Sequence, residues 1–148
     1  MKLEILSHSA EDTMLLGRKI VKLAKPGSVF CLTGDLGAGK TTLVRGMALE
    51  LKIKSVVQSP TFNIMKIYFD GNRPLIHIDA YRLADVNTDI GLDEYIGYET
   101  GFTVVEWPEF IAKLIPQNSS TITIQNIGEN NRKIVIESDD ERLMEELK

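Results

Sequence analysis

The chain has few of the features that mark secreted or membrane proteins. It contains one cysteine, Cys31, so an internal disulfide framework is excluded and a reducing compartment is expected. No apolar run approaches the roughly 20 residues that a membrane-spanning helix needs. The first residues, 1–6, are too polar and the apolar stretch too short for a signal peptide. The sequence therefore predicts a cytoplasmic protein with no membrane segment.

Positive charge is also scarce. There are 17 lysines and arginines against 21 aspartates and glutamates, which gives a net charge of −4. A free-standing nucleic-acid-binding domain is usually basic, with its positive charge clustered on one face. Here the basic residues are scattered along the chain, for example Lys22, Lys25, Lys52, Lys54 and Lys66. If the function involves RNA, we expect another protein to hold it, so that this chain meets RNA only indirectly.

The length of the chain limits its organisation. At 148 residues, 43% of them hydrophobic, it is long enough to bury a core but too short for a nucleotide-binding domain plus a full second domain. We find no internal repeat, linker or low-complexity tract. We therefore expect one domain that spans residues 1–148.

Apolar patterning predicts an alternation of strands and helices. The expected strands are 2–6, 28–33, 62–69, 75–79, 102–106, 121–127 and 133–137, and the expected helices are 9–23, 42–51, 108–115 and one capped by Ser138 or Asp139. The short links within 62–79 and within 121–137 predict antiparallel hairpins. This pattern predicts an α/β fold with a mixed sheet, parallel in the centre with antiparallel additions, flanked by helices.

The most informative motif lies between the second strand and the second helix. Residues 34–41 read Gly-Asp-Leu-Gly-Ala-Gly-Lys-Thr, a full match to the phosphate-binding loop (P-loop) G-x-x-x-x-G-K-[ST]. Its glycines let successive backbone N–H groups turn toward an anion, and the positive end of the following helix points at the same phosphates. The motif predicts a nucleotide-binding site built from Asp35, Leu36, Gly37, Ala38, Gly39, Lys40, Thr41 and Thr42.

Two residues of this motif have predicted chemical roles. Lys40 is expected to reach the β- and γ-phosphates, and the Thr41 hydroxyl to occupy one Mg²⁺ position. We expect Lys40 to face solvent at the loop, since its partners would be ligand atoms. The motif and its strand–loop–helix setting together predict a P-loop NTPase.

A P-loop also needs an acidic partner at the end of a nearby strand, and two residues qualify. Asp79 ends the strand 75–79 and Glu106 ends the strand 102–106. The carboxyl ends of central parallel strands face the ligand crevice of such sheets. Each residue alone is also a reasonable turn-capping carboxylate. Spacing does not decide which of the two binds the metal and which orients water.

Several neighbours of these carboxylates have both a structural and a functional interpretation. His77 lies on the same strand face as Asp79, where a structural histidine is more common than one that polarises water. Trp107 either packs or stacks on a base or a partner. Arg82 is either a surface arginine or a phosphate contact. The segment 59–62, Ser-Pro-Thr-Phe, occupies a position suited to sensing a γ-phosphate.

Three other functions are possible for a P-loop protein, and the sequence argues against the first two. A small-molecule kinase would need a positively charged lid, but the sizeable insertion 85–101 contains no lysine or arginine. A GTPase-type module would carry an Asn-Lys-x-Asp segment, which this chain lacks. A nucleotide-gated adaptor, whose ATP turnover is incidental, is compatible with every motif found.

Four blocks in this order resemble the TsaE (YjeE) family of bacterial P-loop ATPases, which act in tRNA threonylcarbamoyladenosine synthesis. The blocks are residues 34–42, residues 59–62, residues 77–82 (His-Ile-Asp-Ala-Tyr-Arg) and residues 106–109 (Glu-Trp-Pro-Glu). The His-x-Asp-x-Tyr-Arg block is far more specific than the P-loop alone. With the capped first helix the resemblance covers about residues 9–127.

The resemblance implies a function and assigns roles. It implies slow hydrolysis of ATP with Mg²⁺, and association with a TsaB–TsaD pair that transfers a threonylcarbamoyl group to an adenosine beside the tRNA anticodon, at position 37. By the family pattern Thr41 and Glu106 would bind Mg²⁺. Asp79 would assist hydrolysis beside Lys40, and the segments around Thr61 and from Arg82 to Glu94 would behave as switch-like loops.

Overall fold

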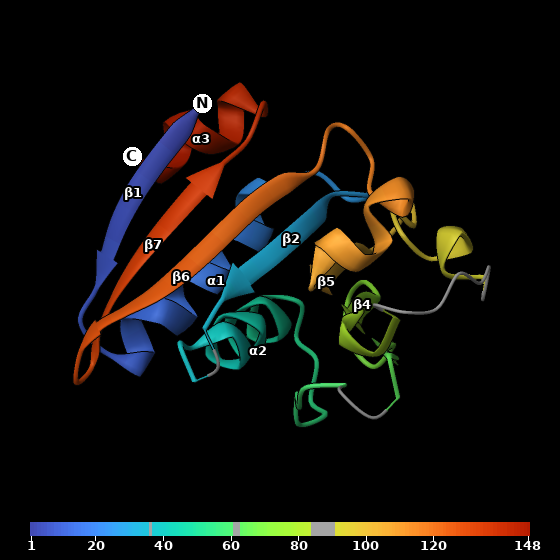
Figure 1. Ribbon diagram of the computed structural model, residues 1–148, viewed down its shortest axis with the longest axis horizontal. Helices are drawn as coiled ribbons and strands as arrows, with labels where there is room; N and C mark the ends of the chain where they lie inside the picture. The colour runs from blue at the N-terminus through green and yellow to red at the C-terminus, as the bar shows by residue number, and fades with distance from the viewer. Residues whose placement is uncertain (36, 61–62, 84–90) are drawn as a thin grey trace.

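The computed structural model describes residues 1–35, 37–60, 63–83 and 91–148. Its seven strands form one sheet in the order β1-β7-β6-β2-β5-β4-β3 (Figure 1). The strands are β1 (Lys2–Ser7), β2 (Val29–Gly34), β3 (Met65–Tyr68), β4 (Leu75–Asp79), β5 (Phe102–Glu106), β6 (Ser120–Gly128) and β7 (Asn131–Glu137). The helices are α1 (Ala10–Leu23), α2 (Lys40–Glu50), α3 (Glu141–Leu147) and three 3₁₀ segments, η1 (Tyr81–Leu83), η2 (Leu92–Glu94) and η3 (Pro108–Leu114).

The sheet is parallel in the centre and antiparallel at its edges, as predicted. Strand β2 pairs in parallel with both β5 and β6, and β4 pairs in parallel with β5. The antiparallel pairs are β3 with β4, β6 with β7, and β7 with β1. The carboxyl ends of β2, β4 and β5 therefore lie together at one edge, where α/β sheets bind their ligands.

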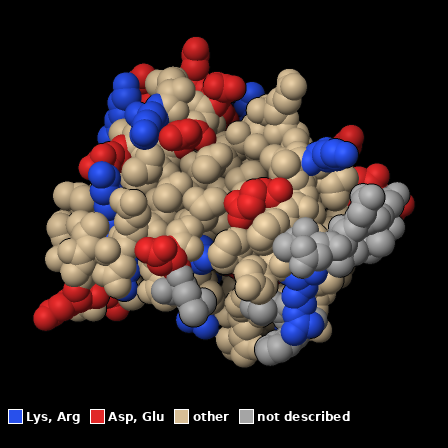
Figure 2. Space-filling view, viewed as in Figure 1, with Lys and Arg blue, Asp and Glu red and all other residues tan. Residues whose placement is uncertain are grey.

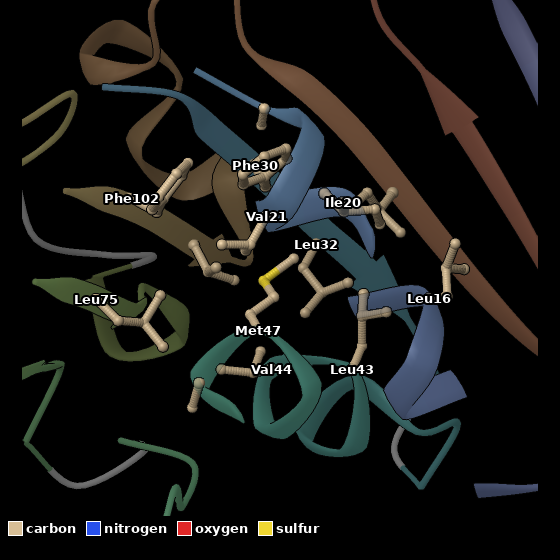
Figure 3. Close-up of a cluster of buried hydrophobic side chains, with 14 of the residues drawn as sticks. Leu16, Ile20, Val21, Phe30, Leu32, Leu43, Val44, Met47, Leu75 and Phe102 are labelled. Atoms are coloured by element: carbon tan, nitrogen blue, oxygen red, sulfur yellow. The ribbon is translucent and has the colours of Figure 1, made fainter. Parts of the chain in front are cut away.

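The two faces of the sheet are covered differently. All three α-helices pack on one face, where side chains of α1 and α2 meet those of β2, β4 and β5 around Met47 (Figure 3). The other face is covered mainly by the 3₁₀ segments and the chain around them, with Leu83, Leu92 and Ile111 packed on Ile76, Ile78 and Val105. Alternate residues of the central strands thus enter two separate cores, which makes those strands apolar on both faces.

Two glycines allow α1 and α2 to pack closely. A Cβ added to Gly17 would clash with the Leu43 carbonyl oxygen, and one added to Gly46 would clash with the Met14 carbonyl oxygen. Each helix therefore contacts the backbone of the other at a position where it has no side chain. This contact holds α2, and the P-loop before it, against α1 and the sheet.

Most of the predicted elements are confirmed, including the N-cap of α1, where the Ser9 side chain accepts a hydrogen bond from the Asp12 N–H at 3.0 Å. The prediction of a helix at 108–115 is corrected to the 3₁₀ segment η3, because Ile111 has non-helical φ and ψ and kinks it. The cap of α3 is Asp140, not Ser138 or Asp139, since the Asp140 carboxylate accepts from the Leu143 N–H. The strand expected at 62–69 is shorter, because the Ile64 N–H bonds to the Pro60 carbonyl and forms a turn.

In the part of the chain that the structure describes, no helix is both long and apolar enough to cross a membrane.

Candidate functional site: a P-loop beside two carboxylates

The loop between β2 and α2 has the backbone that its glycines predict. Gly34 (φ 142°), Gly37 (φ 78°) and Gly39 (φ 106°) all have positive φ, where other residues are strained. At Gly34 the space is restricted as well, since an added Cβ would clash with the Ile124 carbonyl oxygen of β6. The glycine spacing of the motif is thus required by the path of the chain from β2 to α2.

Helix α2 begins at the end of this loop with its N-terminus open. Gly39 is the N-cap, so no side chain occupies the position from which the first N–H groups are usually capped. The first turn contains no acidic residue. An anion beside this N-terminus would gain both free N–H donors and the positive end of the helix dipole.

A cavity of about 570 Å³ lies in front of the loop, at the carboxyl ends of β4 and β5. Its lining residues come from the loop and α2, the segment before β3, and the ends of β4 and β5: Gly37, Gly39, Lys40, Thr41, Thr42, Ser59, Asp79, Tyr81, Glu106 and Trp107. The structure therefore brings together Lys40, Thr41, Asp79 and Glu106, the residues for which catalysis or metal binding was predicted. Of the other predicted nucleotide-binding residues, Asp35 and Ala38 do not line the cavity and Leu36 lies outside the described residues.

Lys40 is held inside the site, so the expectation that it faces solvent is wrong. Its side chain is 11% exposed, and Nζ lies 3.7 Å from Glu106 Oε1. Nζ also donates a hydrogen bond to the Gly34 carbonyl oxygen at 2.9 Å. The ammonium group of Lys40 thus contacts both the start of the loop, at Gly34, and the carboxylate of Glu106.

Glu106 is buried between two nitrogen donors. His77 Nε2 lies 2.7 Å from Glu106 Oε2, while Lys40 faces the other oxygen. Burial raises the pKa of Glu106, but the hydrogen bond and electrostatic interaction with His77, together with Lys40, outweigh burial and leave that pKa below its ordinary value. The carboxylate is therefore ionised at neutral pH, as a metal ligand must be.

Asp79 is the register partner of Glu106 on the neighbouring strand and is also buried. Asp79 Oδ1 accepts a hydrogen bond from the Tyr81 N–H at 3.0 Å, which caps the turn after β4. The turn-capping interpretation of this residue is thus confirmed. Its position on the cavity wall is compatible with a second role toward a ligand.

An aromatic cluster beside the carboxylates was only partly foreseen. The Trp107 ring stacks on Phe110 at 5.8 Å between centroids, and the Tyr81 ring lies 5.1 Å from that of Trp107. Lys40 Nζ lies 5.7 Å from the Trp107 ring centroid. Trp107 is both packed and 39% exposed, and its φ of 57° is uncommon for a bulky residue. The sequence showed an aromatic residue next to Glu106 but not that Tyr81 and Phe110 surround it.

Arg132 contacts the P-loop, and the motif does not predict this contact. From β7 its Nε donates to the Ala38 carbonyl oxygen at 2.9 Å, so the β6–β7 hairpin supports the P-loop. Nothing in the local sequence signals this contact, because the two residues are 94 positions apart. Of the predicted γ-phosphate sensor, residues 59–62, Ser59 lines the cavity, while Thr61 and Phe62 lie outside the described residues. Of the predicted switch-like segment from Arg82 to Glu94, residues 84–90 also lie outside them.

The donor set fits Mg²⁺ rather than a metal held by protein ligands alone. In the described parts of the chain no group of three or more histidine, cysteine, aspartate or glutamate side chains could hold a metal ion. Mg²⁺ is usually bound by one or two carboxylates together with substrate phosphates and water. One carboxylate, Glu106, and one hydroxyl, Thr41, beside a phosphate-binding loop match that requirement.

The fold and the site together define a P-loop α/β protein: a mixed sheet with the glycine loop after β2, an open helix N-terminus and two carboxylates at the adjacent strand ends. The family model described as "Threonylcarbamoyl adenosine biosynthesis protein TsaE" matches residues 7–134. The chain belongs to the TsaE family, whose role is in tRNA threonylcarbamoyladenosine biosynthesis.

Individual relatives agree with this membership. The chain is 45% identical over 124 residues to the tRNA threonylcarbamoyladenosine biosynthesis protein TsaE of Bacillus subtilis (strain 168), with 84% of this chain and 78% of the relative covered. It is 41% identical to the protein of the same name from Treponema pallidum (strain Nichols), with 88% and 97% covered. The crystal structure of Bacillus subtilis YdiB superposes with a TM-score of 0.81 at 35% identity, over 99% of this chain and 92% of that one.

Proposed function

We propose that the chain is a cytoplasmic, Mg²⁺-dependent ATPase that hydrolyses ATP slowly by itself. In this proposal it supports threonylcarbamoyladenosine formation at tRNA position 37 together with a TsaB–TsaD pair. The observation that carries the proposal is the single cavity that Lys40, Thr41, Asp79 and Glu106 share in front of an open helix N-terminus. Family membership supports the pathway, and the cavity supports the chemistry.

The residues divide the work as follows. The loop N–H groups and the α2 N-terminus bind the phosphates, and Lys40 moves from the Gly34 carbonyl toward them. Thr41 and Glu106 would hold Mg²⁺, which would supply positive charge against the bound phosphates. Asp79 accepts a hydrogen bond from the attacking water and orients it. Glu106 is already ionised in the absence of a ligand, so the site needs no proton loss before it binds a cation.

Charge on the surface supports an indirect contact with tRNA. On the face shown in Figure 2, the lysines and arginines occur singly or in small groups between acidic and uncharged residues. The net charge of −4 agrees with this distribution. We therefore propose that the partner proteins, and not this chain, bind tRNA directly.

A binding and turnover experiment tests the proposal. The single tryptophan, Trp107, lines the cavity and is partly exposed, so its fluorescence should report nucleotide binding. We expect Lys40→Ala and Thr41→Ala to fold, to lose productive ATP use, and to release no phosphate above background. A folded variant that hydrolyses ATP at the parental rate would show that the site is assigned wrongly.

The same experiment separates the alternatives. A small-molecule kinase would consume ATP only when an acceptor is present, and a GTPase-type module would favour GTP. A nucleotide-gated adaptor would bind ATP but give no turnover that its partners increase. Recovery of a TsaB–TsaD pair from a pull-down in the presence of ATP would support the proposed pathway directly.

A further inference from the structure

His77 lies in the middle of β4, fully buried, between the apolar core and the functional site. Its Nε2 is within hydrogen-bond distance of Glu106 Oε2 at 2.7 Å. Its second ring nitrogen, Nδ1, has no hydrogen-bond partner among the described residues. Because an ionised carboxylate only accepts hydrogen bonds, Nε2 carries the proton and donates to Glu106.

The burial of His77 with an Nδ1 that has no partner among the described residues lowers the stability of the fold. A buried polar atom without a partner loses its hydration and regains nothing, so an apolar side chain would suit the core of β4 better. Two neighbours of His77 on the same sheet face are apolar: Leu75, two residues earlier on β4, and Val104, its register partner on β5. The other two are charged: Lys66 is its register partner on β3, and Asp79 lies two residues later on β4. The contact with Glu106 is the one described interaction that sets a histidine apart from a leucine here.

The contact fixes one half of the Glu106 carboxylate. Oε2 is turned toward β4 by His77, while Oε1 lies on the side of Lys40, 3.7 Å from Nζ. Rotation of the carboxylate away from this orientation would break the His77 hydrogen bond, because neither of its two equivalent oxygens would then face Nε2. One defined oxygen of Glu106 is therefore directed to the side of the site where the P-loop lysine lies.

We propose that His77 is a positioning residue that holds Glu106 so that a single oxygen, Oε1, is presented to Mg²⁺. The inference rests on the proposed function, since it takes Glu106 as a metal-binding residue. It differs from a water-polarising role, because His77 acts through Glu106 and does not line the cavity. Groups that orient metal ligands in this way typically affect metal affinity by about 10–100-fold.

Three substitutions of His77 test the proposal. His77→Leu removes the donor and keeps an apolar core. His77→Gln places an amide N–H near the position of Nε2, whereas the shorter His77→Asn places it near the position of Nδ1 and does not reach Glu106. Val104→Ala is the matched control: it loosens the packing directly beside His77 and leaves the hydrogen bond intact.

The measurement is a Mg²⁺ titration of ATP binding, followed by Trp107 fluorescence, with EDTA as the metal-free reference. We expect His77→Leu and His77→Asn to raise the Mg²⁺ concentration needed for half-maximal effect by about 10–100-fold. His77→Gln should restore most of the parental response, and Val104→Ala should lower the stability but not the Mg²⁺ response. Affinity for ATP in EDTA should change by less than about twofold, because the loop and α2 are untouched.

Each outcome decides between a positioning role and a packing role. A parental Mg²⁺ response in His77→Leu would overturn the proposal. So would equal losses of the Mg²⁺ response in His77→Gln and His77→Asn, or a loss of that response in Val104→Ala as large as in His77→Leu. If His77→Leu does not fold, the comparison of Gln with Asn decides the question, since both keep a polar side chain. A parent chain whose ATP affinity is insensitive to Mg²⁺ would instead overturn the proposed metal site, and this inference with it.

Discussion

Asp79 and Glu106 are register partners at the ends of two adjacent parallel strands, β4 and β5, so their side chains leave the sheet on the same face. They nevertheless have different surroundings. Glu106 is bonded to His77 and lies beside Lys40, whereas Asp79 caps the turn that leads into Tyr81. Two carboxylates that spacing alone could not distinguish are thus distinguished by their contacts.

This difference predicts different defects in the two amide variants. We expect Glu106→Gln to weaken Mg²⁺-dependent ATP binding more than Asp79→Asn does, because Glu106 has the ionised, oriented carboxylate. Asp79→Asn should bind Mg²⁺ and ATP almost as the parent does but turn over more slowly, by about 10²-fold or more if it assists proton transfer. A Mg²⁺ titration of binding and a single-turnover assay on both variants measure the two effects. The reverse order of the two defects would mean that the roles are exchanged.

The lowered pKa of Glu106 predicts how stability depends on pH. A carboxyl whose pKa is lower in the folded protein than in the unfolded chain stabilises the fold above its unfolded pKa of about 4.3, and this contribution is lost as the pH falls through the folded pKa. Glu106→Gln should therefore be less stable than the parent at pH 7, and the difference should shrink below about pH 4. Denaturant unfolding of both chains between pH 7 and pH 3 measures it. A difference that stays constant over this range would contradict the assignment.

The glycine contact between α1 and α2 predicts a packing defect away from the cavity. Gly46→Ala adds a methyl group where the Met14 carbonyl oxygen of α1 lies, so the helices must separate. We expect a loss of about 1–3 kcal/mol in the free energy of unfolding, although alanine is the better helix former. Leu49→Ala, an exposed position of the same helix, is the control and should change stability by less than about 0.5 kcal/mol. Equal stability of Gly46→Ala and the parent would show that the contact is not tight in solution.

The placement of the site residues is predictable from the sequence where it depends on neighbours in the chain. The glycines of residues 34–39 specify a backbone path, and the apolar runs before Asp79 and Glu106 identify strand ends, so the P-loop and both carboxylates were predictable. The contacts from Arg132 to the Ala38 carbonyl and from His77 to Glu106 were not, because they depend on which strands become neighbours. The burial of the Lys40 side chain was not predicted for the same reason, because the carboxylate beside it, Glu106 in β5, lies 66 positions away in the chain.

The cavity is poor in positive charge, which bears on the rate of hydrolysis. Among the described residues that line it, Lys40 is the one cation, and it faces the carboxylate of Glu106. Phosphoryl transfer requires neutralisation of the charge that develops on the transferring group. Enzymes of this kind that lack an arginine at the transferred phosphate are slower by about 10³–10⁵, which corresponds to roughly 4–7 kcal/mol in the barrier.

We therefore predict slow turnover by the isolated chain and a large acceleration in the assembled complex. The partner would either supply a cation or order Arg82, which follows the turn capped by Asp79. Steady-state phosphate release by the chain alone, and with a TsaB–TsaD pair added, measures the effect. Arg82→Ala separates the two sources: it should abolish the acceleration if Arg82 supplies the charge, and leave it intact if the partner does. Fast turnover of the chain alone, unchanged by partners, would mean that the site is already complete, because no further charge would then be needed in the transition state.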